Sequence, residues 1–248
     1  MFTGLQVRIL QWISPGPPAW STVSIYDGKC KIGMLFGDEF LASLAGKTVV
    51  DFCCGEGLEA VEMVRRGARR VIGIDIREDV LQQARDNARI AGVEETCEFV
   101  SSTDNPADVV VSIDSFEHFS DPAKVLDLMD NLLQPCGEVL VSFGPTWYHP
   151  LGGHLFSVFP WAHLLFSEKA LIRWRSGFKT DGATRFGEVA GGLNQMTIGR
   201  FEKLVKQSAF RFASMELVPI RKLRPFHNRL TREFTTALVR CRLIKQTG

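Results

Sequence analysis

The sequence predicts an α/β fold in which helices cover both faces of a doubly wound, mainly parallel sheet. Three observations support this prediction. From position 47 onward, short apolar runs alternate with segments of helical periodicity. A glycine-containing turn directly follows the first of these runs. The chain of 248 residues is 45% hydrophobic and 23% charged, an ordinary balance for a single globular domain with a substantial core.

The first five strands are expected where short apolar runs end at turn signals. These runs are residues 48–52, 70–74, 97–100, 108–113 and 138–143. Gly67 and Gly92 end the first two helices, and Asp121 with Pro122 begins the third. The predicted helices are residues 58–66, 78–91 and 122–133. The segment Pro135-Cys136-Gly137 is expected to turn the chain into the fifth strand.

The remaining parts of the chain follow a different pattern. We expect an N-terminal extension and helix over residues 1–46, in which several prolines make residues 1–30 irregular. The strand–helix alternation also stops over residues 144–195, which form a long insertion. A helix over residues 198–208, capped by Thr197, and two strands near residues 212–217 and 235–243 then complete the domain.

Charge and cysteine usage exclude several classes of protein. The net charge of +1 offers no broad attraction for nucleic acid, so nucleic acid is not a predicted partner. Six scattered cysteines favour neither a structural zinc site nor a disulfide framework, and no metal ligand is assigned. The apolar stretch at residues 5–13 is too short and too polar for a signal peptide or a membrane span. The sequence therefore predicts a cytoplasmic protein.

The most informative stretch runs from Val49 to Gly57, where a strand enters a turn containing two glycines. Such a turn lets the backbone approach a nucleotide-like ligand closely. The spacing Gly55-x-Gly57-x-x-Ala60, with Asp75 at the end of the second strand, also satisfies a dinucleotide fingerprint. However, Asp51 places a carboxylate at the end of the first strand. A carboxylate there suits a ligand with an ammonium or sulfonium group and does not suit a pyrophosphate.

At this point the sequence resembles the class I S-adenosylmethionine-dependent methyltransferases. The resemblance rests on the run from Asp51 to Gly57, on Gly73-Ile74-Asp75, and on the Glu117-His118 pair after the fourth strand. It extends through the residues before the fifth strand and covers residues 47–143 in order and spacing. The resemblance implies a Rossmann-like, seven-stranded sheet with its last strand antiparallel, and S-adenosylmethionine as the cofactor.

The resemblance also implies roles for individual residues. Asp51 would face the methionine amino group of the cofactor, Gly55 and Gly57 would line that end of it, Asp75 would hold the ribose, and Ile76 would pack on the adenine. An alternative for Asp75 is that it only caps the following helix.

The sequence departs from the family pattern in two places. Cys53 replaces the usual first glycine of the loop, and we expect it and Cys54 to be small buried fillers and not nucleophiles. The segment after the third strand is short, so Asp104 is assigned to the adenine amino group, with Ser102 as the alternative. Asp114, after the fourth strand, is also assigned to the cofactor site.

The acceptor side of the site is expected after the fourth and fifth strands. Glu117 and His118 resemble the Glu-His pair of small-molecule methyltransferases, and their surroundings also resemble the cyclopropane fatty-acid synthase group. Alternatively, both side chains bond to loop backbone and only shape the pocket. In either case, methyl transfer from a sulfonium is an in-line displacement that depends mainly on alignment and the exclusion of water.

The insertion at residues 144–195 is predicted to form a lid over the acceptor. It concentrates aromatic residues and contains His149, His154 and His163. We expect Gly152-Gly153 to act as a flexible joint, and His154 to accept a proton from the acceptor, with His118 as the rival base. Aromatic lining favours a hydrophobic or aromatic small-molecule acceptor. The other interpretation is that these aromatics bury themselves against the sheet or form a homodimer contact.

The sequence therefore predicts an S-adenosylmethionine-dependent methyltransferase acting on a small molecule, with catalytic candidates His154, His118 and Glu117. Two alternatives remain open. One is a lipid-modifying enzyme similar to cyclopropane synthases, and the other is a cofactor-binding protein without catalysis.

Overall fold

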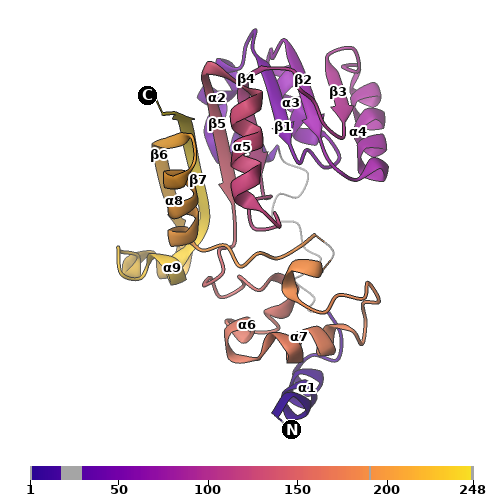
Figure 1. Cartoon of the computed structure of the whole chain (residues 1–248), viewed down its shortest axis with the longest axis vertical. Helices are drawn as coiled ribbons and strands as arrows, with labels where there is room; N and C mark the ends of the chain where they lie inside the picture. Colours follow the sequence, from indigo (N-terminus) through magenta and orange to yellow (C-terminus); the bar gives the residue numbers. More distant parts are fainter. Residues whose placement is uncertain (1, 18–29, 190, 247–248) are drawn as a thin grey trace.

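A computed structural model describes residues 2–17, 30–189 and 191–246 of the chain. Its centre is a seven-stranded sheet with the order β3-β2-β1-β4-β5-β7-β6 (Figure 1). The strands are β1 (Thr48–Phe52), β2 (Arg70–Ile74), β3 (Cys97–Val100), β4 (Ala107–Ile113), β5 (Leu133–Phe143), β6 (Phe210–Pro219) and β7 (Thr236–Lys245). Neighbours among β1 to β5 pair in parallel, and β7 is antiparallel to both β5 and β6. The predicted sheet, including its antiparallel last strand, is confirmed.

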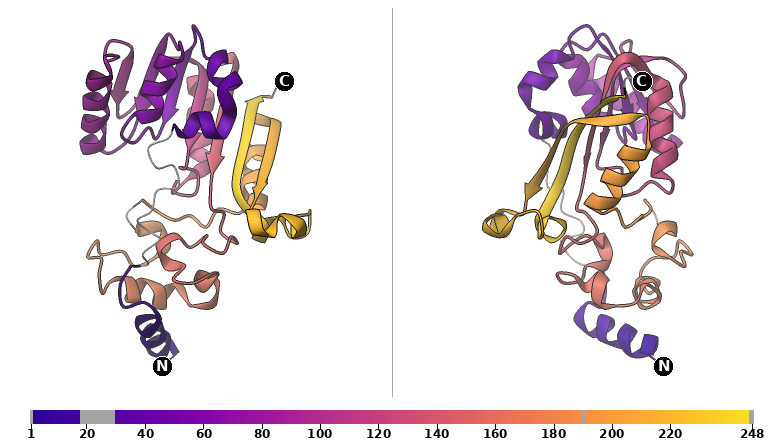
Figure 2. Two further views of the ribbon diagram at one scale, coloured as in Figure 1. Left: turned by 180° about the vertical axis from the view of Figure 1, so that it is seen from behind. Right: turned by 60° about the vertical axis from the view of Figure 1, so that its left-hand side comes forward.

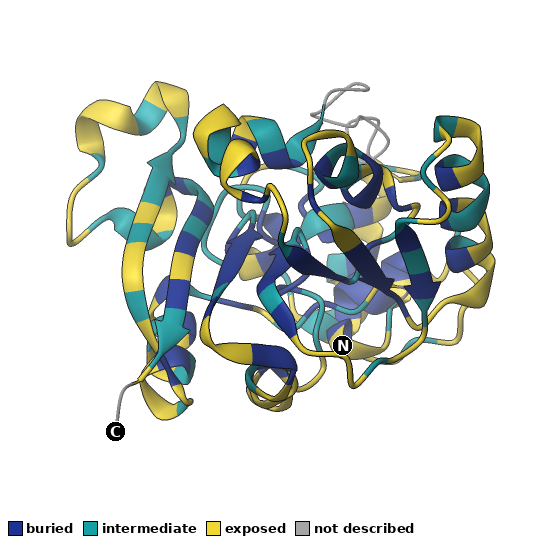
Figure 3. Cartoon of the chain, turned by 90° about the horizontal axis from the view of Figure 1, so that it is seen from above, coloured by how far each residue is buried: buried dark blue, intermediate teal, exposed yellow. Residues whose placement is uncertain are grey.

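Helices pack on both faces of this sheet, as the alternation of the sequence predicts. The helices are α2 (Lys31–Ser43), α3 (Leu58–Arg65), α4 (Glu78–Ala91), α5 (Pro122–Leu132) and α8 (Ile198–Gln207). The apolar sides of α2, α3 and α4 share one core with the sheet, and those of α5 and α8 share another. Seen from above, the inner strands are buried and the outer sides of the helices are exposed (Figure 3).

One predicted turn lies inside a strand. The fifth strand begins at Leu133, although the Pro135-Cys136-Gly137 segment was expected to precede it. The pairing with β4 jumps from Ala107–Leu133 to Val109–Glu138, so the segment between these pairs bulges out of the ladder. Proline has no backbone N–H to donate, which makes such a bulge the natural place for it within a strand.

The insertion forms a small unit of its own beyond the carboxyl end of β5 (Figures 1 and 2). Its elements are η2 (His154–Phe156), α6 (Ala162–Leu165), α7 (Glu168–Arg175) and η3 (Phe186–Glu188). The loop between β6 and β7 contains η4 (Arg221–Phe226) and α9 (Arg232–Thr235). None of the helices in the described ranges is long and apolar enough to cross a membrane.

The prediction that residues 1–30 are irregular was wrong for its first part. Helix α1 (Phe2–Ile13) packs against α7 of the insertion and buries Val7 and Leu10 there. The indole N–H of Trp174 donates to the carbonyl of Ser14 at 2.8 Å, just after this helix. The prolines stand beyond the end of α1 and do not interrupt it, and the part of the prediction that concerns residues 18–29 lies outside the described residues.

Candidate cofactor and acceptor site

The loop between β1 and α3 combines positive φ angles with close packing. Cys53, Gly55 and Gly57 have φ values of 64°, 53° and 74°. A Cβ atom on Gly57 would lie 2.7 Å from the ring of Phe99, so close packing requires glycine there. A Cβ on Gly55 would meet nothing within 4 Å, so this glycine borders open space. The loop therefore presents bare backbone to a ligand at the carboxyl end of the sheet.

The two loop cysteines are partly or fully buried thiols. Cys54 is buried in the core beside α3 and α4, and Cys53 is half-buried against the core on the other face of the sheet. Burial raises the pKa of the Cys53 thiol to about 12 and raises the pKa of Cys54 as well. A thiol with a raised pKa is a poor nucleophile at neutral pH. These positions agree with the prediction that both cysteines fill space beneath the loop.

Asp51 supplies a buried carboxylate that lacks a partner on one oxygen. The residue is 3% exposed, and its Oδ2 atom has no hydrogen-bond partner among the described residues. Its pKa is raised to about 7, chiefly by burial and also by the nearby carboxylates of Glu59 and Asp75. An unpaired buried oxygen costs about 1–3 kcal/mol or more if it is charged. A cationic ligand donating to Oδ2 would remove this cost.

Asp75 is held differently, by four hydrogen bonds. Its carboxylate accepts from the backbone N–H of Gly55 at 3.2 Å, from the backbone N–H of Arg77 at 3.0 Å, and twice from the Arg77 guanidinium at 3.0 Å. Burial alone would raise its pKa, but these bonds to Arg77 and Gly55 outweigh burial and lower it. Arg77 is the N-cap residue of α4, so Asp75 is not the cap of that helix. Asp75 ties the glycine loop to the start of α4.

Two further residues assigned to the adenine side lie at the surface. Ile76 is 90% exposed, which is unusual for a large apolar side chain and leaves it available to a planar ligand. Asp104 is also exposed, in the irregular segment between β3 and β4. Whether either residue contacts the cofactor stays a prediction.

Helix α2 begins beside the glycine loop, a contact that was not predicted from the sequence. The carboxylate of Glu59 in α3 accepts from the backbone N–H groups of Lys31 and Ile32 at 3.3 and 3.1 Å. The ammonium of Lys31 then pairs with Asp114 at 3.0 Å. Asp114, with a φ of 52°, follows β4 directly. Lys31 and Glu59 thus hold α2, α3 and the loop after β4 together, a long-range arrangement that no local pattern signals.

Glu117 and His118 each commit one atom to the backbone. Glu117 is buried, and its Oε1 accepts from the N–H of Gly144 at 3.1 Å, whereas Oε2 has no partner in the described part of the chain. His118 Nδ1 lies 2.9 Å from the carbonyl of Gly192. Because a carbonyl only accepts, Nδ1 carries the proton and Nε2 keeps its lone pair. Burial raises the pKa of Glu117 to about 8.

The loop that carries these two residues is fastened from the far end of the insertion. The side-chain amide of Asn194 donates to the carbonyls of Phe116 and Phe119 at 2.7 and 2.8 Å, and its backbone N–H donates to the carbonyl of Glu117 at 2.9 Å. Gly192 is also fixed, because a Cβ there would lie 2.6 Å from the carbonyl oxygen of His118. Asn194 is therefore a positioning residue for the loop that carries Glu117 and His118, a role that was not predicted from the sequence.

His154 sits on a tight turn. The prediction that its glycines form a flexible joint was wrong. A Cβ on Gly152 would lie 2.2 Å from the carbonyl oxygen of Thr146, and one on Gly153 would lie 2.3 Å from His163. His163 accepts from Ser157 at 2.8 Å and donates to the carbonyl of Trp147 at 2.7 Å. Close packing, and not freedom of movement, therefore requires both glycines.

This turn places His154 against His118. The two rings stack with centroids 5.2 Å apart and planes at 26°. His154 has a φ of 50°, and its buried Nδ1 lacks a partner within the described residues. Its pKa is lowered to about 4, chiefly by burial and also by the neighbouring rings of His118, His163 and His149. The structure thus brings the three catalytic candidates together, but it makes His154 a weaker base than a free imidazole.

Most aromatics of the insertion build its own core. Trp147, Phe156, Phe166, Trp174, Phe178 and Phe186 cluster with α1. Beside them, a cavity of about 510 Å³ opens next to His118 and His154, and Phe156 is the aromatic residue in its lining. Such a volume suits a small ligand. The concentration of aromatics therefore reflects a second core more than an aromatic-lined pocket.

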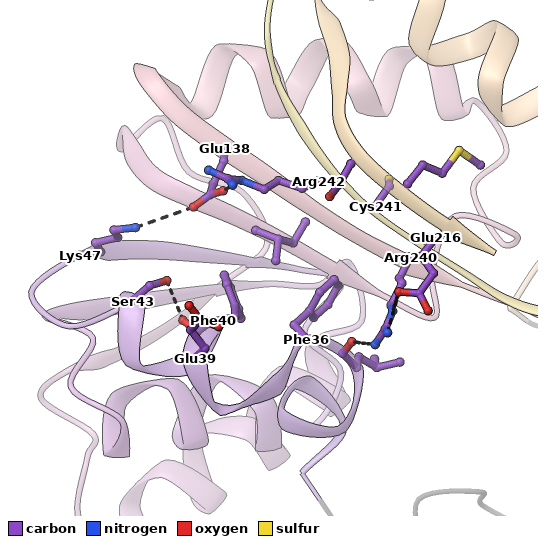
Figure 4. Close-up of a pocket in the computed structure, with 14 residues that line it drawn as sticks. Phe36, Glu39, Phe40, Ser43, Lys47, Glu138, Glu216, Arg240, Cys241 and Arg242 are labelled. Atoms are coloured by element: carbon purple, nitrogen blue, oxygen red, sulfur yellow. Dashed lines mark hydrogen bonds and ion pairs between the residues drawn. The ribbon is translucent and has the colours of Figure 1, made fainter. Parts of the chain in front are cut away.

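A larger hollow of about 750 Å³ lies elsewhere, between α2 and strands β5, β6 and β7 (Figure 4). It contains none of the predicted site residues. Most of its charged groups are already paired: Lys47 and Arg242 with Glu138, and Arg240 with Glu216. We therefore place the candidate site at the carboxyl ends of β1, β2 and β4.

Comparisons with known proteins agree with this placement. Residues 49–137 match the family model described as a methyltransferase domain. A ribosomal protein L11 methyltransferase of Serratia proteamaculans is 46% identical over 70 residues, covering 28% of this chain and 24% of that protein. One of Vibrio cholerae is 37% identical over 100 residues, covering 40% of this chain and 34% of that protein. The similarity thus spans at most about a third of these two relatives.

Similar solved structures cover more of the chain. A methyltransferase of Mesorhizobium loti, named as S-adenosylmethionine dependent, has a TM-score of 0.56 at 16% identity and covers 88% of this chain and 99% of that one. The [4+2]-cyclase SpnF has a TM-score of 0.58 at 15% identity and covers 98% and 94%. At such identities these structures show the fold alone, and SpnF illustrates that the fold does not fix the reaction.

Together, these findings confirm the resemblance to the class I methyltransferases. Residues 49–137 match a methyltransferase domain, and they lie on a Rossmann-like sheet; the cofactor of the class that they resemble is S-adenosylmethionine. The roles of the individual site residues rest on the geometry described above.

Proposed function

We propose that this chain, which contains a class I methyltransferase domain, transfers the methyl group of S-adenosylmethionine to a small molecule. The observation that carries the proposal is the unpaired, buried Oδ2 of Asp51 beside the open backbone of Gly55. A carboxylate in this position complements the ammonium of the cofactor's methionine part and would repel a pyrophosphate. Asp75 and Ile76 extend the same edge of the sheet toward the ribose and adenine.

Residues of this chain would hold the cofactor at several points. Asp51 and Gly55 would receive the methionine end, Asp75 the ribose hydroxyls and Ile76 the adenine, with Asp104 at the adenine amino group. Asp114 and its ion pair with Lys31 would close the methionine end. Once bound, the cofactor supplies an electrophilic methyl group, and the protein's task is to align the acceptor with it and exclude water.

The acceptor is assigned to the cavity beside His118 and His154. Its volume of about 510 Å³ accommodates a small molecule, and Leu155, Phe156 and Leu193 give it an apolar side. His118 and His154 line one part of this cavity, and Glu117 lies buried beside them. Of these, His154 was assigned as the base that takes the acceptor's proton, with His118 as the rival. Both roles require the ring to reach the acceptor by a hydrogen bond.

Tritium transfer from methyl-labelled S-adenosylmethionine tests the proposal. We expect label to enter members of a panel of phenols, amines and thiols. His154→Ala should lower turnover by about 10²-fold or more and leave the affinity for S-adenosylhomocysteine nearly unchanged. His149→Ala is the matched control, because His149 lies in the same insertion and uses its ring to accept from Leu151 at 2.9 Å.

Purified ribosomal protein L11 belongs in the same experiment as a rival acceptor, because the relatives named above carry that description. Label found only in L11 would contradict a small-molecule acceptor. Equal losses of turnover in His154→Ala and His149→Ala would show that the His154 ring has only a structural role.

A further inference from the structure

We infer that Glu117, His118 and His154 bind a divalent transition-metal ion where His118 and His154 line the acceptor cavity. Each residue offers one ligand atom, and these atoms all lie within 4.8 Å of one another. Binding of the ion does not depend on the proposed methyl transfer. Only the role of the ion toward an acceptor rests on that function.

The donor set is the first argument. Two imidazoles and one carboxylate form a combination that zinc and non-haem iron sites use, with further positions left open. Ligand atoms about 2.1 Å from a shared ion lie roughly 3–3.4 Å from each other. The ligand atoms, which lie within 4.8 Å of one another, must therefore move closer together by about 1–2 Å to share an ion.

Two buried polar atoms of this cluster lack a hydrogen-bond partner. Oε2 of Glu117 and Nδ1 of His154 are both buried without a hydrogen-bond partner among the residues that the structure describes. Buried polar atoms are normally satisfied, and a site that gathers unsatisfied acceptors calls for a cation. A cation shared with His118 would satisfy both of these atoms at once.

Neighbouring backbone groups orient two of the ligands, as hydrogen-bond partners of metal ligands do. The Gly192 carbonyl accepts a hydrogen bond from the Nδ1–H of His118, which leaves Nε2 to ligate. The N–H of Gly144 holds Oε1 of Glu117. Both partners are backbone groups on segments packed at the cavity, so they fix the side chains without competing for their free atoms.

The backbone of His154 is a further observation. A non-glycine residue at a φ of 50° is held in an uncommon conformation, and such conformations cluster at functional sites. The preceding residue, Gly153, packs directly on His163. The ring of His163 is held by hydrogen bonds to Ser157 and Trp147. His163 is therefore a positioning residue that presents His154 to His118.

Two of the positive charges near the site are already paired. Arg175, which lines the cavity, is paired with Asp181 through two bonds of 2.6 and 2.5 Å. Lys31, whose charge acts on Glu117, is paired with Asp114 at 3.0 Å. Each of these two cations is matched by a carboxylate, and Lys179 adds one further positive charge to the lining of the cavity.

Such an ion would face the cavity with open positions. It would favour acceptors that coordinate through oxygen, nitrogen or sulfur, and it would lower the pKa of a coordinated hydroxyl or thiol. The acceptor's proton could then leave without a strong base. An imidazole that ligates the ion has no free lone pair, so in the ion-loaded protein the ion takes the place of His154 or His118 as the group that promotes loss of this proton.

Metal binding is tested on the full chain without methyl transfer. Protein stripped by dialysis against a chelator is titrated with Co²⁺ and followed by visible absorption, and with Zn²⁺ followed by thermal unfolding. We expect saturable binding, ligand-field bands of a nitrogen- and oxygen-bound ion, and a higher melting temperature. His118→Ala, His154→Ala and Glu117→Gln should each weaken binding by at least about 10²-fold. His149→Ala and His227→Ala should leave it unchanged.

Two results would overturn the inference. One is the absence of saturable binding by wild-type protein that is folded by circular dichroism. The other is equal binding by the ligand variants and the two control variants. Glu117→Gln keeps the shape of the side chain, so it guards against loss of binding through misfolding. Binding of S-adenosylhomocysteine is measured on the same samples, so a failed metal site and a failed methyltransferase assignment are told apart.

Discussion

At the scale of single residues, the candidate site is marked by atoms that lack partners. Asp51, Glu117 and His154 each keep a buried polar atom without a hydrogen bond among the described residues. The sequence predicted all three residues from their positions after strands or within the insertion. It did not predict their electrostatics, because burial and long-range neighbours such as Lys31 and Glu59 set the pKa values. Those neighbours come from elements that meet only in the folded chain.

The pKa of Asp51 leads to a prediction about pH. Its pKa is raised to about 7 in the free protein, so the carboxyl is increasingly protonated below that pH. Only the ionised form attracts an ammonium group. The affinity for S-adenosylhomocysteine should therefore fall by roughly tenfold between about pH 7.5 and pH 6. Calorimetry at a series of pH values measures this slope.

Asp51→Asn provides the control, because an amide does not titrate. This variant should bind weakly at every pH and lose most of the slope. If the wild type and Asp51→Asn show the same pH dependence, Asp51 does not face the ammonium group.

At the scale of elements, the sequence predicted best where capping residues and periodicity agree. Helix α4 ends at Gly92, which has a φ of 69°, and α5 begins at Asp121, whose side chain accepts from the N–H of Lys124. Helix α1 was missed, because its buried face finds its partner in α7, far away in the sequence. The paired glycines at 152 and 153 were also misinterpreted, because their close contacts are tertiary.

The docking of α1 gives a prediction about stability. Leu10 is fully buried in the core of the insertion, whereas its neighbour Ile9 is largely exposed. Leu10→Ala should lower the free energy of unfolding of this unit by about 2–5 kcal/mol through lost burial and a cavity. Ile9→Ala should lower it by less than about 1 kcal/mol. Urea unfolding followed by tryptophan fluorescence reports the difference, since Trp174 lies in the same core.

Similar small effects of both substitutions would show that α1 is not docked on α7. A large effect of Ile9→Ala alone would place the opposite face of the helix against the protein.

At the scale of the whole molecule, the chain joins a methyltransferase sheet to a second, smaller core. The sheet was predictable, because parallel strands and crossing helices leave a regular pattern in the sequence. The second core was not, because strands β1 to β5 separate α1 from the insertion along the chain. The match to the family model is confined to residues 49–137, so it covers the cofactor half of the site, whereas His154 on the acceptor side lies outside it.

Isothermal titration calorimetry with S-adenosylhomocysteine and with NAD tests the central claim most directly. We expect saturable binding of S-adenosylhomocysteine and none of NAD, because the buried Asp51 carboxylate accepts hydrogen bonds from an ammonium group and repels a pyrophosphate. Asp75→Ala should weaken S-adenosylhomocysteine by at least about tenfold through lost hydrogen bonds. Asp79→Ala, an exposed acid in the first turn of α4, should not. Binding of NAD without binding of S-adenosylhomocysteine would contradict the assignment of S-adenosylmethionine as the cofactor.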